Sequence, residues 1–207
     1  MAAEPEPKPE LDAAIGDGDA EKSAPTTPPP KATRRKDGLI VLHTGNGKGK
    51  TTAALGLALR ALGHGMDVCM IQFIKGKWSC GEHEAAKVFG ERFEIHPVGD
   101  GFTWDTKNRA QDIARVREGW ELAMDKVRSG RFRMLILDEI NYVLSYGYME
   151  AREVLEFLAT KPASLHVVLT GRNPPPELLE AADLVTEMVK VKHPYEAGIK
   201  AQKGIEF

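Results

Sequence analysis

The stretch HTGNGKGKTT, His43–Thr52, decides the fold of this chain. It follows the apolar run GLIVLHT and leads into TTAALGLALRALG, whose alanines and leucines favour a helix with a C-cap at Gly63. Strand, glycine-rich loop and helix in this order are the setting of a phosphate-binding P-loop.

The end of this loop, Gly49-Lys50-Thr51, carries the chemistry. Backbone N–H groups at a helix start face an anion, the lysine adds a positive charge, and the threonine hydroxyl can ligate Mg²⁺. The usual spacing puts a glycine where this chain has Thr44, so the loop is a variant, and a turn that binds nothing is the alternative. We expect the ATP-binding residues to be Gly45, Asn46, Gly47, Lys48, Gly49, Lys50, Thr51 and Thr52.

Two acids, Asp138 and Glu139, end the apolar run of MLILDE. At the carboxyl end of a buried strand they would stand beside the P-loop and organise Mg²⁺ together with Thr51. The alternative is that an acid here only caps the next helix. Arg172, in LTGR at the end of another apolar run, either lies near bound phosphate or is an ordinary surface arginine.

Outward from the loop, strand-like and helix-like segments alternate along the chain. Apolar runs predict further strands within 67–74, 93–99, 132–140, 165–171 and 184–191, and helices are predicted near 82–89, 109–129, up to 160, and 176–182. Alternation with several strands apolar throughout predicts an α/β fold, with a mainly parallel sheet and helices on both faces.

Residues 1–37 differ in composition from the rest of the 207-residue chain. They hold 7 of the 13 prolines and no aromatic residue, so we expect a disordered acidic, proline-rich tail before one domain at 38–207. Removing the tail's 8 acidic and 6 basic residues from totals of 30 and 28 leaves 22 of each. Such a balanced domain favours small-molecule partners over nucleic acid or a membrane surface.

Two cysteines, Cys69 in an apolar run and Cys80 in a loop, make a disulfide framework improbable. The chain also has no apolar stretch of spanning length and no apolar leader, so we expect a cytoplasmic protein.

The segment GFTWDTKNR, 101–109, places two large aromatic residues in a loop. If the segment is extended, Phe102 and Trp104 point the same way and present an apolar wall to a large flat ligand. The alternative is that both rings pack into the core beneath the loop.

Several segments together resemble one known family, the ATP:corrinoid adenosyltransferases, which make adenosylcobalamin. They are TGNGKGKTTAALG, QFIKG, GFTWDTKNR, LILDEINY, TGR and VKHPYEAGIKAQKGIEF, in this order from about Gly38 to Phe207. The resemblance implies a RecA-like P-loop fold and a homodimer. It also implies transfer of the 5′-deoxyadenosyl group of ATP to the cobalt of a reduced corrinoid, with tripolyphosphate leaving.

The same resemblance implies roles for individual residues. Gly45–Thr51 match the family's phosphate site, Thr51 and Glu139 match its Mg²⁺ site, and Phe102 and Trp104 match the aromatic pair beside the corrin. The family's nucleotide is reported to run through the loop in the reverse sense, and we hypothesise that the shifted glycines reflect this. Cobalt(I) is itself a strong nucleophile, so the expected catalytic residues are Lys50, which stabilises the leaving triphosphate, and the two rings, which keep cobalt four-coordinate.

The sequence leaves two rival functions open. A RecA-like ATPase or kinase would cleave ATP at the γ-phosphate, and a non-enzymatic carrier would only bind ATP or corrinoid. If the chain is an adenosyltransferase, we also expect an electron-donating flavoprotein reductase as a partner. We expect the terminal KAQKGIEF to dock and close the pocket, a frayed end being the alternative. Some family members carry a basic amino-terminal helix over the partner's site, whereas this chain begins with an acidic tail.

Overall fold

The computed structural model describes residues 38–75, 80–99 and 108–207. Residues Lys36–Phe207 form one compact unit. Phe102 and Trp104, and the tail at 1–37, lie outside the described residues.

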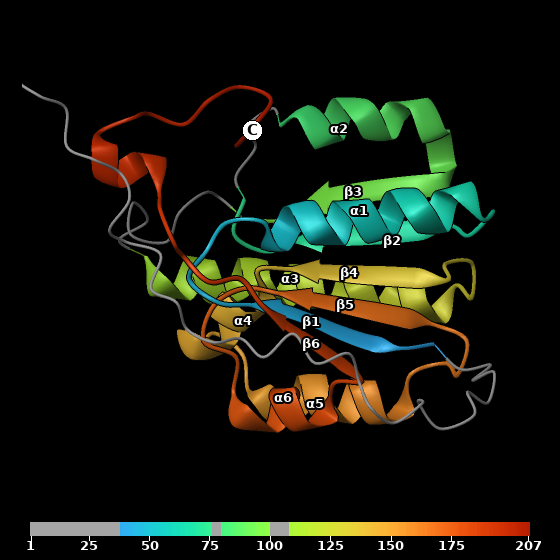
Figure 1. Cartoon of the computed structure of the whole chain (residues 1–207). Helices are drawn as coiled ribbons and strands as arrows, with labels where there is room; N and C mark the ends of the chain where they lie inside the picture. The colour runs from blue at the N-terminus through green and yellow to red at the C-terminus, as the bar shows by residue number, and fades with distance from the viewer. Residues whose placement is uncertain (1–37, 76–79, 100–107) are drawn as a thin grey trace, which may run out of the picture. The chain divides into compact units, whose positions relative to one another are not determined.

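Six strands form one sheet, and every strand pair in it is parallel. Their order across the sheet is β3-β2-β4-β5-β1-β6, which puts the first strand of the chain between the last two (Figure 1). The strands are β1 (Ile40–Thr44), β2 (Val68–Gln72), β3 (Phe93–Pro97), β4 (Met134–Asp138), β5 (His166–Thr170) and β6 (Leu184–Glu187).

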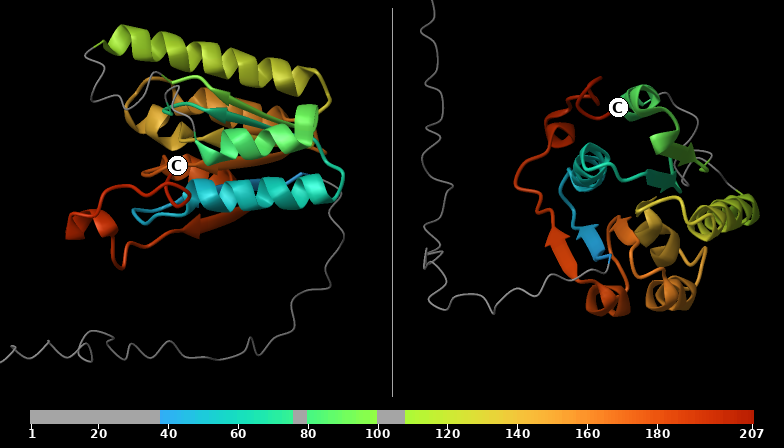
Figure 2. Two further views of the ribbon diagram at one scale, coloured as in Figure 1. Left: turned by 90° about the horizontal axis from the view of Figure 1, so that it is seen from above. Right: turned by 90° about the vertical axis from the view of Figure 1, so that its right-hand side faces the viewer.

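Helices connect the strands and cover both faces of the sheet (Figure 2). Helices α1 and α2 lie on one face, and α3 to α6 lie on the other. The helices are α1 (Lys50–Gly63), α2 (Gly81–Ala86), α3 (Arg109–Arg128), α4 (Ile140–Ser145), α5 (Ala151–Thr160) and α6 (Pro176–Ala181), with the 3₁₀ helices η1 (Lys87–Arg92) and η2 (Pro194–Ala197).

Cover on both faces explains why the central strands are apolar at nearly every position. Strands β2 and β4 are buried at all five of their residues. Their side chains alternate between two cores: Ile71 and Leu137 pack with the helices α3 to α6, and Met70 and Ile136 pack beneath α1. The predicted α/β fold, a parallel sheet with helices on both faces, is therefore confirmed.

One local prediction is wrong. Helix α1 does end at Gly63, but its C-cap is His64, and the left-handed backbone conformation falls on Gly65, with φ 80°. Glycine adopts the left-handed conformation just past a C-cap without strain, so the glycine that terminates α1 is Gly65, two residues later than predicted.

Candidate active site at the phosphate loop

The phosphate loop lies at the carboxyl end of β1, where the backbone of Met188 hydrogen-bonds to it. Gly47 N donates to Met188 O at 2.6 Å, and Met188 N donates to Thr44 O at 2.8 Å. A Cβ on Gly45 would lie 2.4 Å from Met188 O, and Gly45 also has φ 95°. Gly45 therefore serves close backbone packing as well as a left-handed turn.

Lys50 begins helix α1 and folds back over the loop. Its ammonium donates to Gly45 O at 2.8 Å and to Gly47 O at 2.7 Å, and the residue is buried. Burial lowers the pKa of Lys50, and the negative charge of Glu139 opposes that effect. The lysine is thus held at the centre of the loop by weak backbone acceptors that an anion would replace.

Thr51, the next residue, connects the loop to the acids at the end of β4. Its hydroxyl donates to Asp138 Oδ1 at 2.9 Å, and Thr170 donates to the same oxygen at 2.8 Å. Asp138 is completely buried, and burial raises the pKa of its carboxyl. Because the Thr51 hydroxyl donates its hydrogen to Asp138, the lone pairs of its oxygen can accept a cation.

Glu139 adopts a left-handed backbone conformation, with φ 63°, between β4 and α4. Its N–H donates to Thr170 Oγ1 at 2.9 Å, while the buried Oε2 has no hydrogen-bond partner among the described residues. Burial raises the pKa of Glu139 to about 7 and Asp138 adds to the rise, whereas Lys50, Lys75 and Arg172 oppose it. Gly171 leaves room for this carboxyl, because a Cβ there would lie 3.1 Å from Oε2.

This geometry argues against the alternative that the acids only cap a helix. Glu139 stands at the N-cap of α4, yet its side chain makes no capping hydrogen bond. A strained backbone and an unpartnered buried carboxylate are costs that a bound cation would offset.

The donor set fits magnesium bound together with triphosphate. Within the described ranges, no group of three or more His, Cys, Asp or Glu side chains could hold a metal ion alone. Mg²⁺ is commonly held by one or two carboxylates and takes its other ligands from phosphates and water, so the orphaned oxygen of Glu139 and the Thr51 hydroxyl suffice.

The end of the chain reaches the same loop. Lys48 Nζ lies 2.5 Å from Glu206 Oε2, and a turn holds Glu206, whose N–H donates to Gln202 O at 2.9 Å. In Figures 1 and 2 the terminal segment ends near the start of α2, on the face of the sheet that α1 also covers. The predicted docking of KAQKGIEF thus agrees with the structure at Glu206, although much of the segment is exposed.

The structure also describes the exit of the aromatic loop. Asn108 caps helix α3, its side chain accepting from Gln111 N at 3.3 Å. Strand β3, which precedes this loop in the sequence, runs parallel to β1, so the two strands end at the same edge of the sheet. Phe102 and Trp104 themselves fall outside the described residues.

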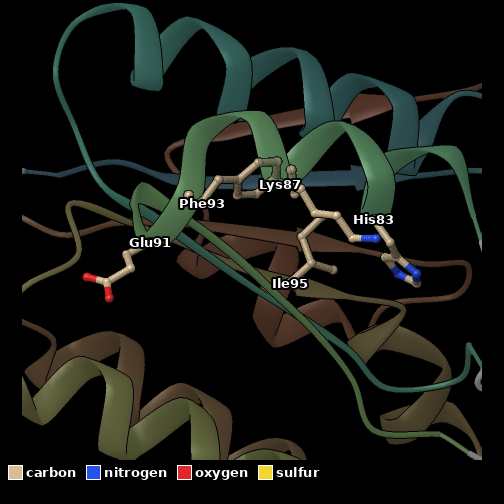
Figure 3. Close-up of a pocket in the computed structure, with 7 residues that line it drawn as sticks. His83, Lys87, Glu91, Phe93 and Ile95 are labelled. Carbon is tan, nitrogen blue, oxygen red and sulfur yellow. The ribbon is translucent and has the colours of Figure 1, made fainter.

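A hollow of about 450 Å³ lies apart from the phosphate loop, between α2, η1 and β3. Figure 3 shows His83 at one end of its lining and Glu91 at the other. No residue of the phosphate loop lines it, so it belongs to a different part of the surface.

Sequence reasoning missed three residues of the site: Gln72, Thr170 and Gly171. Gln72 is fully buried beside Asp138, and Thr170 holds both acids in place. The sequence contained a signal for Gln72 and Thr170, because each is a polar residue that ends a strand directly after a run of apolar residues.

With this geometry established, comparison with known proteins supplies the family. The family model described as "ATP:corrinoid adenosyltransferase BtuR/CobO/CobP" matches residues 36–207. The chain belongs to this family.

Similar proteins agree with this membership. A corrinoid adenosyltransferase from Sinorhizobium sp is 49% identical over 172 residues, which cover 82% of this chain and 80% of that protein. One from Pseudomonas aeruginosa is 47% identical, covering 84% and 86%, and one from Escherichia coli K12 is 45% identical, covering 82% and 86%. Among solved structures, a KaiC-like protein from Pyrococcus horikoshii OT3 has a TM-score of 0.44 at 18% identity, covering 73% and 72%.

The reaction of an ATP:corrinoid adenosyltransferase follows from this membership. The chain is an enzyme that transfers the adenosyl group of ATP to a corrinoid, and the ATPase, kinase and carrier alternatives are not favoured. In the part of the chain that the structure describes, no helix is long and apolar enough to cross a membrane.

Proposed function

We propose that the phosphate loop grips the triphosphate of ATP while a corrinoid substrate presents cobalt(I) to the C5′ carbon of its ribose. The cobalt–carbon bond forms as the C5′–O bond breaks, and the bond's electron pair leaves with tripolyphosphate. The observation that carries this proposal is the cluster of Lys50, Thr51 and the unpartnered Glu139 around one loop at the carboxyl end of β1.

The loop's part is electrostatic. Lys50 exchanges the carbonyls of Gly45 and Gly47 for phosphate oxygens, and the backbone N–H groups at the start of α1 face the same anion. Residues Gly45 to Thr52 therefore stabilise the charge that gathers on the leaving group.

Thr51 and Glu139 are the proposed Mg²⁺ ligands. Bound there with ATP, the ion supplies neutralising charge to the triphosphate. The ion would give Oε2 of the buried Glu139 carboxylate a partner, which would offset part of the free energy lost on burying its charge.

Phe102 and Trp104 are the proposed corrinoid-binding pair. Their rings exclude water and the lower axial ligand, so that cobalt is four-coordinate when it is reduced. Trp104→Ala is expected to lose activation of the corrinoid while ATP binding survives. Equal loss of both would indicate that the ring serves folding instead.

The deciding experiment uses the full chain with ATP, Mg²⁺ and chemically reduced cobalamin. We expect a light-sensitive cobalt–carbon product and one equivalent of tripolyphosphate for each adenosyl group transferred. Orthophosphate, or a phosphorylated acceptor, would indicate cleavage at the γ-phosphate and refute the proposed attack at carbon. Turnover beyond one equivalent would exclude a carrier.

We further propose that the enzyme works as a homodimer in the cytoplasm, supplied with electrons by a flavoprotein reductase. Support for the dimer comes from the exposed apolar side chains of edge strand β6 and the segment after it, namely Leu184, Val185, Val189 and Val191. The two free, buried cysteines, Cys69 and Cys80, fit a reducing compartment. Sedimentation of the wild-type chain and of Val191→Asp tests the dimer, since a monomeric wild-type chain would contradict it.

A further inference from the structure

Gln72 is a fully buried amide at the carboxyl end of β2, and it lies among ionisable side chains. Strand β2 pairs with β4 in a register that sets Gln72 opposite Asp138. Burying an amide is costly unless its hydrogen bonds are made, so its partners define its role.

The partners fix which way the amide points. Gln72 Nε2 lies 3.4 Å from Asp138 Oδ2 and 3.5 Å from Glu82 Oε1, while its Oε1 lies 2.7 Å from His83 Nε2. The amide nitrogen is the atom that faces both acids, so the NH₂ group donates to their oxygens. The amide oxygen must then accept from His83, which assigns the ring proton to Nε2.

These contacts complete the set of donors around Asp138. Oδ1 accepts from Thr51 and Thr170, and Oδ2 faces Gln72, so groups from α1, β5 and β2 hold one carboxylate. A carboxylate fixed in this way receives the Thr51 hydrogen in one direction and leaves the hydroxyl lone pairs aimed away from it.

We propose that Gln72 is a positioning residue for adenosyl transfer: it orients Asp138, and through it Thr51, toward magnesium triphosphate, while His83 holds the amide. This inference rests on the Mg²⁺ site proposed above at Thr51 and Glu139. Gln72 itself touches neither substrate nor ion. Its contribution is to the affinity for Mg²⁺ rather than to the corrinoid.

The test measures Mg²⁺ binding to the enzyme–ATP complex by calorimetry, without corrinoid, and then initial rates of adenosylcobalamin formation against free Mg²⁺, with ATP and reduced cobalamin saturating. In Gln72→Met, which keeps the shape and removes the amide, we expect the half-saturating Mg²⁺ concentration to rise about 10- to 100-fold. The KM for corrinoid should stay within about twofold of the wild-type value.

His83 provides a second, milder perturbation, because it lies at the rim of the open hollow and its replacement leaves no closed cavity. His83→Ala should raise the half-saturating Mg²⁺ concentration less than Gln72→Met does. His83→Gln keeps an N–H donor, so its half-saturating Mg²⁺ concentration should return to the wild-type value. These variants carry the test if Gln72→Met fails to fold.

Met70→Leu is the matched control, since it changes a fully buried residue of the same strand that packs in the apolar core. It should leave the Mg²⁺ requirement unchanged whatever it does to thermal stability. If the Gln72 and His83 variants resemble this control, or raise the KM for corrinoid instead, the positioning role is refuted.

Thr51→Ala separates this inference from the site beneath it. A raised Mg²⁺ requirement in Thr51→Ala without one in Gln72→Met overturns the positioning role alone. An unchanged requirement in Thr51→Ala refutes the proposed Mg²⁺ site, and the role of Gln72 is refuted with it.

Discussion

Glu139→Gln is expected to make the ligand-free protein more stable, because it removes a buried charge that has no hydrogen-bond partner at Oε2 among the described residues. Burial raises the pKa of Glu139 from 4.5 to about 7, with Asp138 adding to the rise. This difference corresponds to about 3 kcal/mol at 1.36 kcal/mol for each pKa unit. The amide keeps the shape of the side chain and the strained backbone of residue 139, so the charge is the main change.

The sign of the effect follows from proton linkage. Below the unfolded pKa of 4.5 the carboxyl is protonated in both states and its charge costs nothing. As the pH rises toward 7 the unfolded chain releases its proton first, so the folded state loses stability until both are ionised. The gain from Glu139→Gln should therefore be up to about 3 kcal/mol near pH 8 and only about 1 kcal/mol near pH 5.

Urea denaturation at these two pH values, without nucleotide or Mg²⁺, measures the difference. Glu82→Gln is the matched control: burial favours a higher pKa for Glu82, but the contact with Lys75 outweighs it and leaves the pKa lowered. Its stabilising charge is present above its unfolded pKa and lost as the pH falls, so this variant should be less stable near neutrality. If Glu139→Gln does not raise the free energy of unfolding at the higher pH, or raises it equally at both pH values, the ionised carboxylate does not destabilise the folded protein.

Three further outcomes are expected. Lys50→Ala removes the ammonium that is proposed to exchange the carbonyls of Gly45 and Gly47 for phosphate oxygens, so it should weaken ATP binding by roughly 100-fold, or about 3 kcal/mol, measured by calorimetry. A change under about threefold would contradict this role. Gly45→Ala places a Cβ 2.4 Å from a carbonyl oxygen and should lower the free energy of unfolding by more than about 2 kcal/mol. The control Gly56→Ala, in open space on α1, should raise the free energy of unfolding by about 0.5–1 kcal/mol. Equal effects would show that the loop tolerates side chains. Glu206→Gln frees Lys48 and should raise the affinity for tripolyphosphate about two- to fivefold, because an ion pair with a half-exposed lysine is weak. A lowered affinity would mean that Glu206 helps to hold the anion site together.

The sequence predicts the sheet well because its physical cause is local. A strand buried on both faces must be apolar at nearly every position, and β2 and β4 are read directly from that pattern. The P-loop is equally local, since a short glycine-rich stretch between a strand and a helix sets its chemistry.

Features that depend on distant parts of the chain could not be read in this way. The Glu139 carboxyl depends on the space at Gly171, and Gln72 gains its contacts with Glu82 and His83 only when α2 packs near the end of β2. The position of Gly65, rather than Gly63, at the end of α1 reflects competition between two nearby glycines that composition does not rank.

The place of β1 in the sheet has a consequence for biosynthesis. This strand is synthesised before the other five, yet its hydrogen-bonding neighbours are β5 and β6, made at least 120 residues later at roughly 5–20 residues per second. Strands β2, β3 and β4 can pair with one another while the nascent chain grows, whereas the amino-terminal strand waits unpaired. The nucleotide pocket is therefore the last part of the enzyme to form, and a prematurely terminated chain would leave an apolar strand exposed for chaperones to capture.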